Sequence, residues 1–136
     1  MKYALYILTF ISFSLSEVYD GYTLFTPAAG GGTVTYLKDS NWNTIHEWDH
    51  NCSAASMPYL VLTDEPGIEN SLLYYPCRNS NPIMETGGVG GRVQIYNWDG
   101  DLLWDFQISG TLSGATSNNA FQHHHDIEPL PNGNIL

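Results

Sequence analysis

Positive charge is scarce in this sequence. Its 136 residues include four Lys and Arg against 14 Asp and Glu, which gives a formal net charge of −10 at pH 7. A nucleic-acid partner is not expected, because proteins that bind nucleic acids need cationic side chains to displace counterions from the phosphates. Binding to an anionic membrane surface is disfavoured for the same reason. The acidic balance favours solubility and says little about the fold.

Long apolar runs are also lacking, apart from one at the N-terminus. Residues 3–15 are uncharged and mostly apolar, a lysine precedes them, and Ser14 and Ser16 are the small residues that a cleavage site needs. This layout predicts a secretory signal peptide over residues 1–16, since the run is short for a transmembrane helix. We expect residues 17–136 to be secreted or periplasmic, with no membrane span after cleavage. A buried N-terminal strand or helix is the alternative.

Cysteine is rare, with only Cys52 and Cys77 in the chain. Their spacing is not that of a CxxC pair or of another metal-ligand set. In an exported protein the two thiols can form a disulfide, which for a loop of this size contributes about 3 kcal/mol in the chain-entropy treatment. Two free thiols remain the alternative, because a single pair of cysteines is a weak signal.

No long segment shows the periodicity of an amphipathic helix. Short runs of β-branched, aromatic and alternating residues recur instead between clusters of Gly, Asn, Asp and Pro, which is typical of an all-β fold. Residues 98–101 (WDGD) and 131–134 (PNGN) are the clearest turns, because Asp-Gly and Asn-Gly tolerate the positive φ of tight hairpins. The predicted strands are residues 21–25, 33–37, 44–48, 59–62, 71–75, 92–96, 102–106 and 126–130.

The chain repeats itself weakly. The stretch GGTVTYLKDSNWNTIHEW (31–48) is similar to GGRVQIYNWDGDLLWDF (90–106), because both contain two glycines, a strand, an acidic turn and a strand that ends in aromatic residues. The shift between the copies is ambiguous, at roughly 56, 58 or 59 residues. A period of this size with several strands per unit predicts a β-propeller, and a β-sandwich is the alternative. Trp48, Trp98 and Trp104 are predicted to pack between blades.

The final residues, LPNGNIL, indicate a strand, an Asn-Gly turn and the start of a return strand. A domain rarely ends there, because the edge of the hairpin stays unpaired. A propeller blade also needs neighbours, and a propeller needs at least about four blades. We therefore expect residues 17–136 to be the N-terminal part of a propeller domain, truncated at the C-terminus and holding about two blades.

Three histidines and an aspartate follow one another near the C-terminus. If they form a strand, alternation sends His123 and His125 to one face of the sheet and the side chains of His124 and Asp126 to the other. One interpretation is a solvated polar loop. A second is a metal site in which His123 and His125 share an ion with help from Asp126. A third is a catalytic site for an anionic substrate, with a histidine as acid, base or nucleophile.

Four stretches carry a family resemblance: GYTLFTP, TYLKDSNWNTIHEW, GGRVQIYNWDGDLLWDF and HHDIEPLPNGNIL. They occur in the order seen in the arylsulfotransferase (aryl-sulfate sulfotransferase) family, which the chain resembles over about residues 20–136. The resemblance implies an exported bacterial protein built as a β-propeller, six-bladed when complete. It also implies transfer of a sulfuryl group from a phenolic sulfate ester to a phenol, without a cofactor, by a ping-pong mechanism through a sulfohistidine.

The resemblance assigns roles to the matching positions. His124, His125 and Asp126 match the HHD of the family. We expect His125 and His124 to be catalytic by contacting the transferred group, and Asp126 to be substrate-binding or to orient a histidine. His123 is an extra histidine with no expected role. The nucleophilic histidine of the family is expected in a unit beyond Leu136, so the 136 residues alone are expected to be inactive.

The first turn departs from the family, because DSNWNT carries Trp42 in place of the usual glycine. Two other functions stay open: a non-catalytic propeller that binds a ligand or a protein, and a propeller that binds a metal through residues 123–126. The partners expected of the enzyme are a small aryl sulfate and a phenol, and the sequence leaves the oligomeric state open.

Overall fold

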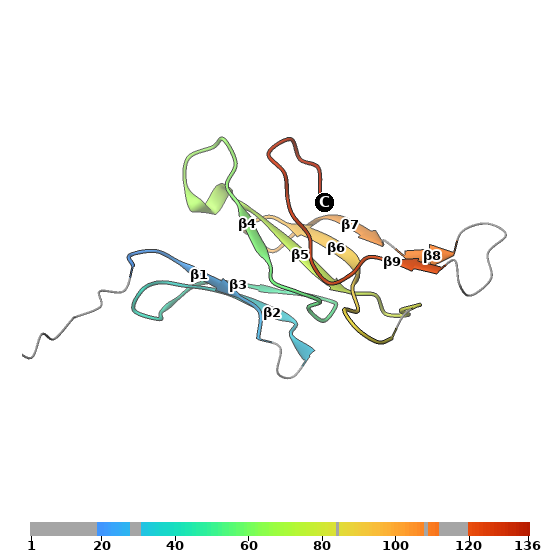
Figure 1. Ribbon diagram of the computed structural model, residues 1–136. Helices are drawn as coiled ribbons and strands as arrows, with labels where there is room; N and C mark the ends of the chain where they lie inside the picture. Colours follow the sequence, from blue (N-terminus) through green and yellow to red (C-terminus); the bar gives the residue numbers. More distant parts are fainter. Residues whose placement is uncertain (1–18, 28–30, 84, 108, 112–119) are drawn as a thin grey trace, which may run out of the picture.

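Figure 1 shows the computed structural model of the chain, which describes residues 19–27, 31–83, 85–107, 109–111 and 120–136. The signal peptide expected over residues 1–16 lies outside these ranges. Within them the chain forms nine β-strands, one short 3₁₀ helix (Ile68–Asn70) and no α-helix, so the all-β prediction is confirmed. The same ranges contain no helix with the length and apolar character needed to cross a membrane.

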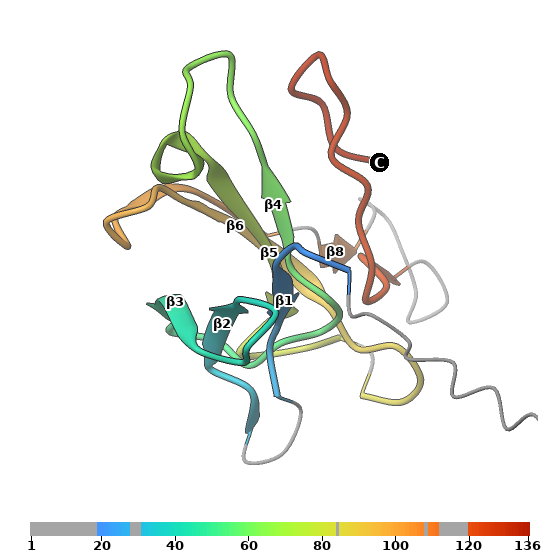
Figure 2. The ribbon, with the colours of Figure 1, turned by 90° about the vertical axis from the view of Figure 1, so that its left-hand side faces the viewer.

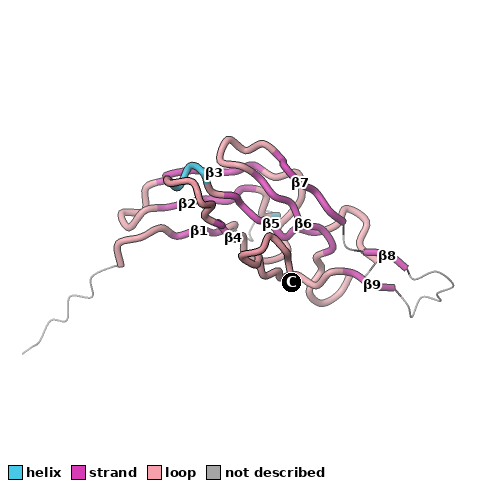
Figure 3. Tube along the Cα trace, turned by 90° about the horizontal axis from the view of Figure 1, so that it is seen from above, coloured by secondary structure: helices cyan, strands magenta, loops and turns pink. Residues whose placement is uncertain are grey.

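The strands form two antiparallel sheets and one separate pair. The first sheet has the order β1-β2-β3 and the second has the order β4-β5-β6-β7, so each strand pairs with its neighbour in the chain. The pair β8-β9 extends beyond one end of the second sheet (Figures 1 and 3). The bounds are β1 Thr23–Phe25, β2 Val34–Lys38, β3 Thr44–Asp49, β4 Tyr59–Val61, β5 Leu72–Arg78, β6 Gly91–Tyr96, β7 Leu102–Gln107, β8 Ser109–Thr111 and β9 Ala120–Gln122.

The main core lies where the first sheet meets the second (Figure 2). Alternation along each strand sends one set of side chains into this interface, and burying each large apolar one contributes about 1.5–3 kcal/mol. The disulfide Cys52–Cys77 joins the loop after β3 to β5 inside the core, with Cα atoms 5.9 Å apart. The buried members are Leu37, Trp48, Cys52, Leu73, Tyr75, Cys77 and Tyr96.

The two hairpins β2–β3 and β6–β7 share one register. Thr35 pairs with Trp48 in the first, and Val93 pairs with Phe106 in the second, each 58 residues further along the chain. Every other pair of β2–β3 has its counterpart at the same shift, including the bulge that follows Leu37 and recurs after its counterpart. The repeat is therefore real, and its shift is 58 residues rather than 56 or 59.

The turns of the two hairpins also match at this shift. In the first, the amide of Trp42 donates to the carbonyl of Asp39, and in the second the amide of Gly100 donates to the carbonyl of Asn97. Trp42 has a φ of 67° and Gly100 a φ of 84°. The tryptophan thus occupies a left-handed position that favours glycine, and its exposed ring stacks on Phe25 with centroids 5.7 Å apart.

The tryptophans have different surroundings. Trp48 and Trp98 meet between the sheets with ring centroids 5.5 Å apart, as predicted for packing residues. Trp48 Nε1 also donates to the carbonyl of Asn97, 2.9 Å away, which ties β3 to the β6–β7 turn. Trp104 differs from the prediction, because it lies on the outer face of the second sheet and is 40% exposed.

The C-terminal residues cover part of that outer face. Ile127 is buried against Tyr74 and Val93. The strand predicted over residues 126–130 forms only in part: Pro129 bridges Ile135, and backbone hydrogen bonds join residue 128 to residue 136 and residue 130 to residue 134. The PNGN turn itself forms as predicted, since the amide of residue 130 donates to the carbonyl of residue 134 and residue 133 has a φ of 82°. Two open, stacked antiparallel sheets are therefore the architecture of the described residues.

Candidate functional site

The histidine segment begins where β9 ends, and it is not a strand. Residues 123–126 have no regular pairing and the chain bends at His125. The expected alternation of side chains between two faces is therefore wrong. The bend instead brings the rings of His124 and His125 together, with centroids 4.1 Å apart and planes at 41°. His124 is exposed and His125 is partly buried, so the pair of imidazoles is open to solvent.

Two glycines just before β6 allow this segment to lie close to the sheet. A Cβ atom on Gly88 would come within 1.7 Å of His125 Cδ2 and 2.3 Å of His124 Nε2. A Cβ atom on Gly90 would come within 2.2 Å of the carbonyl oxygen of His124. These distances are far below van der Waals contact, so neither position has room for a side chain. In the sequence, Gly90 marks the start of the second repeat and Gly88 lies outside it.

Both ring nitrogens of His123 are hydrogen-bonded. Its Nε2 lies 2.7 Å from the carbonyl oxygen of Asp126, and the amide of Gly91 donates to its Nδ1 at 3.3 Å. A carbonyl accepts and an amide donates, so this pairing fits the neutral tautomer with the proton on Nε2. His123 thus has a positioning role that the resemblance did not assign.

The metal interpretation finds little support in this geometry. Both nitrogens of His123 already have partners. Among the residues that the structure describes, no group of three or more His, Cys, Asp and Glu side chains is arranged to hold a metal ion. A pair of exposed imidazoles alone does not supply the three or four ligands that a zinc site needs.

Asp126 is tied to the second sheet. The hydroxyl of Tyr59, on β4, donates to its Oδ1 at 3.1 Å. Burial and this hydrogen bond together raise the pKa of Tyr59 above its ordinary value. The ring of His123 is hydrogen-bonded to the backbone carbonyl of Asp126 and not to its carboxylate. The carboxylate therefore anchors the segment to β4.

Arg92 is the cation closest in sequence to the glycine pair, and it is already paired. Its guanidinium donates from Nε to Asp105 Oδ1 at 2.7 Å and from a second nitrogen to the other carboxylate oxygen. These hydrogen bonds raise the pKa of Arg92 and lower that of Asp105. Gln94 also donates to Asp105, at 3.2 Å. Arg92 could contact an anionic substrate at the imidazole pair only if its ion pair with Asp105 were broken.

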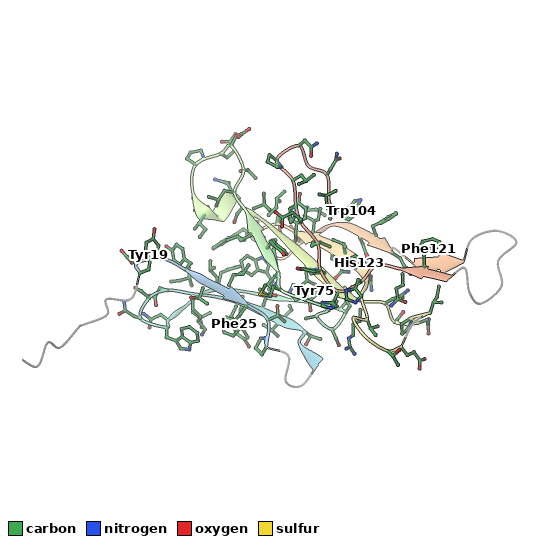
Figure 4. The ribbon with its side chains drawn as sticks, viewed as in Figure 1. Tyr19, Phe25, Tyr75, Trp104, Phe121 and His123 are labelled. Atoms are coloured by element: carbon green, nitrogen blue, oxygen red, sulfur yellow. A yellow bond between two sulfur atoms is a disulfide. The ribbon has the colours of Figure 1, made fainter. Side chains whose placement is uncertain are left out.

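An apolar groove of about 740 Å³ adjoins the histidine segment. Trp104 and Phe106 stack along one wall, with ring centroids 5.3 Å apart. His123 is the residue that the groove shares with the segment, and Figure 4 labels Trp104 and His123. The remaining lining is Ile95, Ile127 and the C-terminal residues Gly133, Asn134, Ile135 and Leu136. We call this feature the Trp104 groove.

A second histidine site was missed from the sequence. His50 follows β3, yet it is 9% exposed and its ring stacks on Tyr75 with centroids 3.6 Å apart. Its Nε2 lies 2.8 Å from Thr35 Oγ1, and its buried Nδ1 has no hydrogen-bond partner among the described residues. Burial lowers the pKa of His50 from 6.5 to about 4. The alternation of His46, Trp48 and His50 was the available signal for burial.

The fold and site together define an antiparallel two-sheet β protein with an exposed pair of imidazoles beside an apolar groove. Comparison with models of known protein families, with curated protein sequences and with solved structures finds no match.

Proposed function

We propose that the chain forms part of an exported, arylsulfotransferase-like β-propeller that moves a sulfuryl group from a phenolic sulfate ester to a phenol. The observation that carries the proposal is the imidazole pair of His124 and His125, whose rings lie 4.1 Å apart and open to solvent. These are the two residues that match the HHD of the family. Two neighbouring imidazoles can donate and accept protons around an anionic group near neutral pH.

The proposed reaction has two balanced steps. In the first, a histidine nitrogen attacks the sulfur, the bond from sulfur to the phenolic oxygen breaks, and the phenolate leaves with the electron pair and takes up a proton. In the second, the oxygen of the acceptor phenol attacks the same sulfur, the nitrogen–sulfur bond breaks, and the acceptor proton passes to a base. His125 and His124 are proposed to donate and accept these protons and to contact the sulfuryl oxygens.

The arrangement of the sheets supports the propeller. Two sheets related by a 58-residue repeat stack face to face, which is how neighbouring blades lie in a propeller. We propose a six-bladed assembly in which the described residues supply two blades. The disulfide Cys52–Cys77 supports a secreted or periplasmic location, because disulfides persist in oxidising compartments.

The test is acceptor-dependent turnover by the full-length protein. With para-nitrophenyl sulfate as donor, nitrophenol release should require an added phenol, and His125→Ala and His124→Ala should each lower the rate by about a hundredfold or more. His46→Gln is the matched control, since the ring of His46 stacks on Trp98 between the sheets. Gly88→Ala should also lower the rate, because its Cβ would displace both rings. Absence of turnover with every acceptor would overturn the proposal.

A non-catalytic binding role is the second candidate, and the Trp104 groove favours it. The groove is apolar, has the volume of a small-molecule site and presents stacked aromatic rings. Under this alternative, a phenol would quench tryptophan fluorescence in the wild type and not in Trp104→Ser, while no sulfuryl transfer would occur. Turnover that depends on His125 would decide against it.

A further inference from the structure

Both arginines of the chain line one pocket between the two sheets. Arg78 ends β5 and Arg92 lies at the start of β6, while residues 51–53 come from the loop after β3 of the first sheet. The pocket has a volume of about 340 Å³ and shares no lining residue with the Trp104 groove. We call it the arginine pocket. Its lining is Thr33, Asn51, Cys52, Ser53, Arg78, Asn79, Ser80 and Arg92.

The lining of the arginine pocket contrasts with the composition of the chain. The sequence has 14 Asp and Glu against four Lys and Arg. No carboxylate is among the described residues that line the pocket, whereas two of the four cationic side chains are. On a protein with a formal net charge of −10, this pocket is therefore a local site of positive charge, which favours an anion.

Arg92 is oriented by an ion pair at its back. Its Nε and one terminal nitrogen donate to Asp105, and the side chain is 24% exposed. The other N–H groups of the guanidinium have no hydrogen-bond partner among the described residues. A paired guanidinium keeps its outward donors in a fixed plane, so Arg92 can donate to a ligand in the pocket while its bonds to Asp105 stay intact.

Arg78 supplies the charge that no carboxylate compensates. Its side chain is exposed, and the ion pair that the described residues contain is that of Arg92. The backbone amide of Arg78 donates to the carbonyl of Ser53 at 2.8 Å. The preceding residue, Cys77, is bonded to Cys52 of the opposite wall. The two walls are thus cross-linked beside the residues that line the pocket, and a preorganised site loses little entropy on binding.

The neutral side chains of the lining add hydrogen-bond donors. Asn51 Oδ1 accepts from Gln94 Nε2 at 3.0 Å, which leaves the Nδ2 hydrogens of Asn51 to donate to a ligand. Hydroxyl groups of Thr33, Ser53 and Ser80 complete the lining. Guanidinium and amide N–H groups only donate, so they fit a ligand whose oxygens only accept.

We propose that the arginine pocket binds a small tetrahedral oxyanion, sulfate or phosphate, free or as a monoester group. Arg78 provides the charged contact, and Arg92 and Asn51 provide fixed donors. A water molecule occupies about 30 Å³ in the liquid, so a pocket of about 340 Å³ holds the anion and leaves room for a substituent on one oxygen. The inference does not rest on the proposed transfer, because none of residues 123–126 lines this pocket.

Equilibrium dialysis of the full-length protein against radiolabelled sulfate, at constant ionic strength in sodium chloride, tests the proposal. The wild type should bind a single sulfate per chain, saturably. Arg78→Gln should raise the dissociation constant about tenfold, because it removes a charged hydrogen-bond donor. Lys38→Gln is the matched control, since it removes the same charge from a residue outside the lining, and its dissociation constant should equal that of the wild type.

A second variant tests the donor role of Asn51. Asn51→Asp keeps an oxygen that accepts from Gln94 and replaces the Nδ2 donor by a negatively charged oxygen. Sulfate binding should be lost in this variant, although the size of the side chain is unchanged. Binding that does not saturate, equal effects of Arg78→Gln and Lys38→Gln, or full binding by Asn51→Asp would each overturn the proposal.

Two competitors identify the form of the anion, and one variant separates this site from the imidazole pair. Displacement of sulfate at lower concentration by inorganic phosphate assigns the pocket to a free anion, and displacement at lower concentration by a sugar sulfate ester assigns it to a group on a larger molecule. Failure of both to displace sulfate would contradict the proposal. His125→Ala should bind sulfate like the wild type even where sulfuryl transfer is lost, and loss of binding in this variant would place the anion at the histidines instead.

Discussion

Acidification should destabilise this fold through one buried histidine. The ring of His50 is stacked on Tyr75 and hydrogen-bonded to Thr35, and within the described part of the chain its Nδ1 has no hydrogen-bond partner. Protonation would place a charge in the core with nothing to compensate it, which is why burial lowers the pKa from 6.5 to about 4. The folded state therefore resists protonation over a pH range in which the unfolded chain accepts a proton.

The sign and size of the effect follow from this difference. Well above pH 6.5 His50 is neutral in both states, and it then contributes nothing to the pH dependence of stability. Between pH 6.5 and pH 4 the unfolded state binds more protons, so the free energy of unfolding falls as the pH falls. A lowering from 6.5 to about 4 corresponds to a loss of about 3 kcal/mol once both states are protonated.

The measurement is urea unfolding followed by tryptophan fluorescence, above pH 6.5 and at steps down to pH 4. His50→Phe keeps an aromatic ring against Tyr75 and removes the titration, so its stability should be flat over this window. Asp39 and Asp105 have lowered pKa values, through hydrogen bonds from Asn43 and Arg92 respectively, and their contributions are lost only below pH 3.8. A wild-type curve as flat as that of His50→Phe would refute the reasoning.

Three further substitutions test the fold by the same unfolding assay. Gly90→Ala should destabilise the protein by about 1–3 kcal/mol, because its Cβ would overlap the backbone of His124; an unchanged midpoint would contradict the placement of the histidine segment. Gly100→Ala should cost about 1 kcal/mol from its φ of 84° alone, since no atom lies near its Cβ, and a gain in stability would refute that geometry. Replacing Cys52 and Cys77 together by Ser should cost about 3 kcal/mol, while equal stability of the wild type under reducing and oxidising conditions would argue against the bridge.

The strands could be predicted because their signals are local. The segments predicted at residues 92–96 and 102–106 became β6 and β7 within one residue at each end. The register of the repeat could not be fixed from side-chain identity, because a shift of about 56 residues, which aligns Trp42 with Trp98, competes with shifts of about 58 and 59. The structure aligns Trp42 with Gly100 instead, since both occupy the same left-handed turn position. The register of the repeat is thus set by backbone conformation, which the amino-acid sequence encodes only indirectly.

The surroundings of the histidines could not be predicted for a different reason. The burial of His50 depends on Tyr75, which is distant in sequence and reaches it only when the two sheets stack. The bend at His125 likewise depends on the glycines before β6, which leave room for the histidine backbone beside the sheet. The predicted alternation of side chains holds only for a β-strand. The histidine segment packs on the loop before β6, so its side-chain directions follow the shape of that loop.

This dependence links any chemistry at the histidine pair to the second sheet. His124 and His125 lie against Gly88 and Gly90, while Tyr59 of β4 holds the carboxylate that follows them. The pair is thus positioned by the edge strand β4 and by the glycines just before β6, and not by its own strand. Loosening either contact should move the rings before it unfolds the core, because the core lies on the opposite face of that sheet. Any chemistry at this site would therefore require an intact second sheet, even though the imidazoles themselves are at the surface.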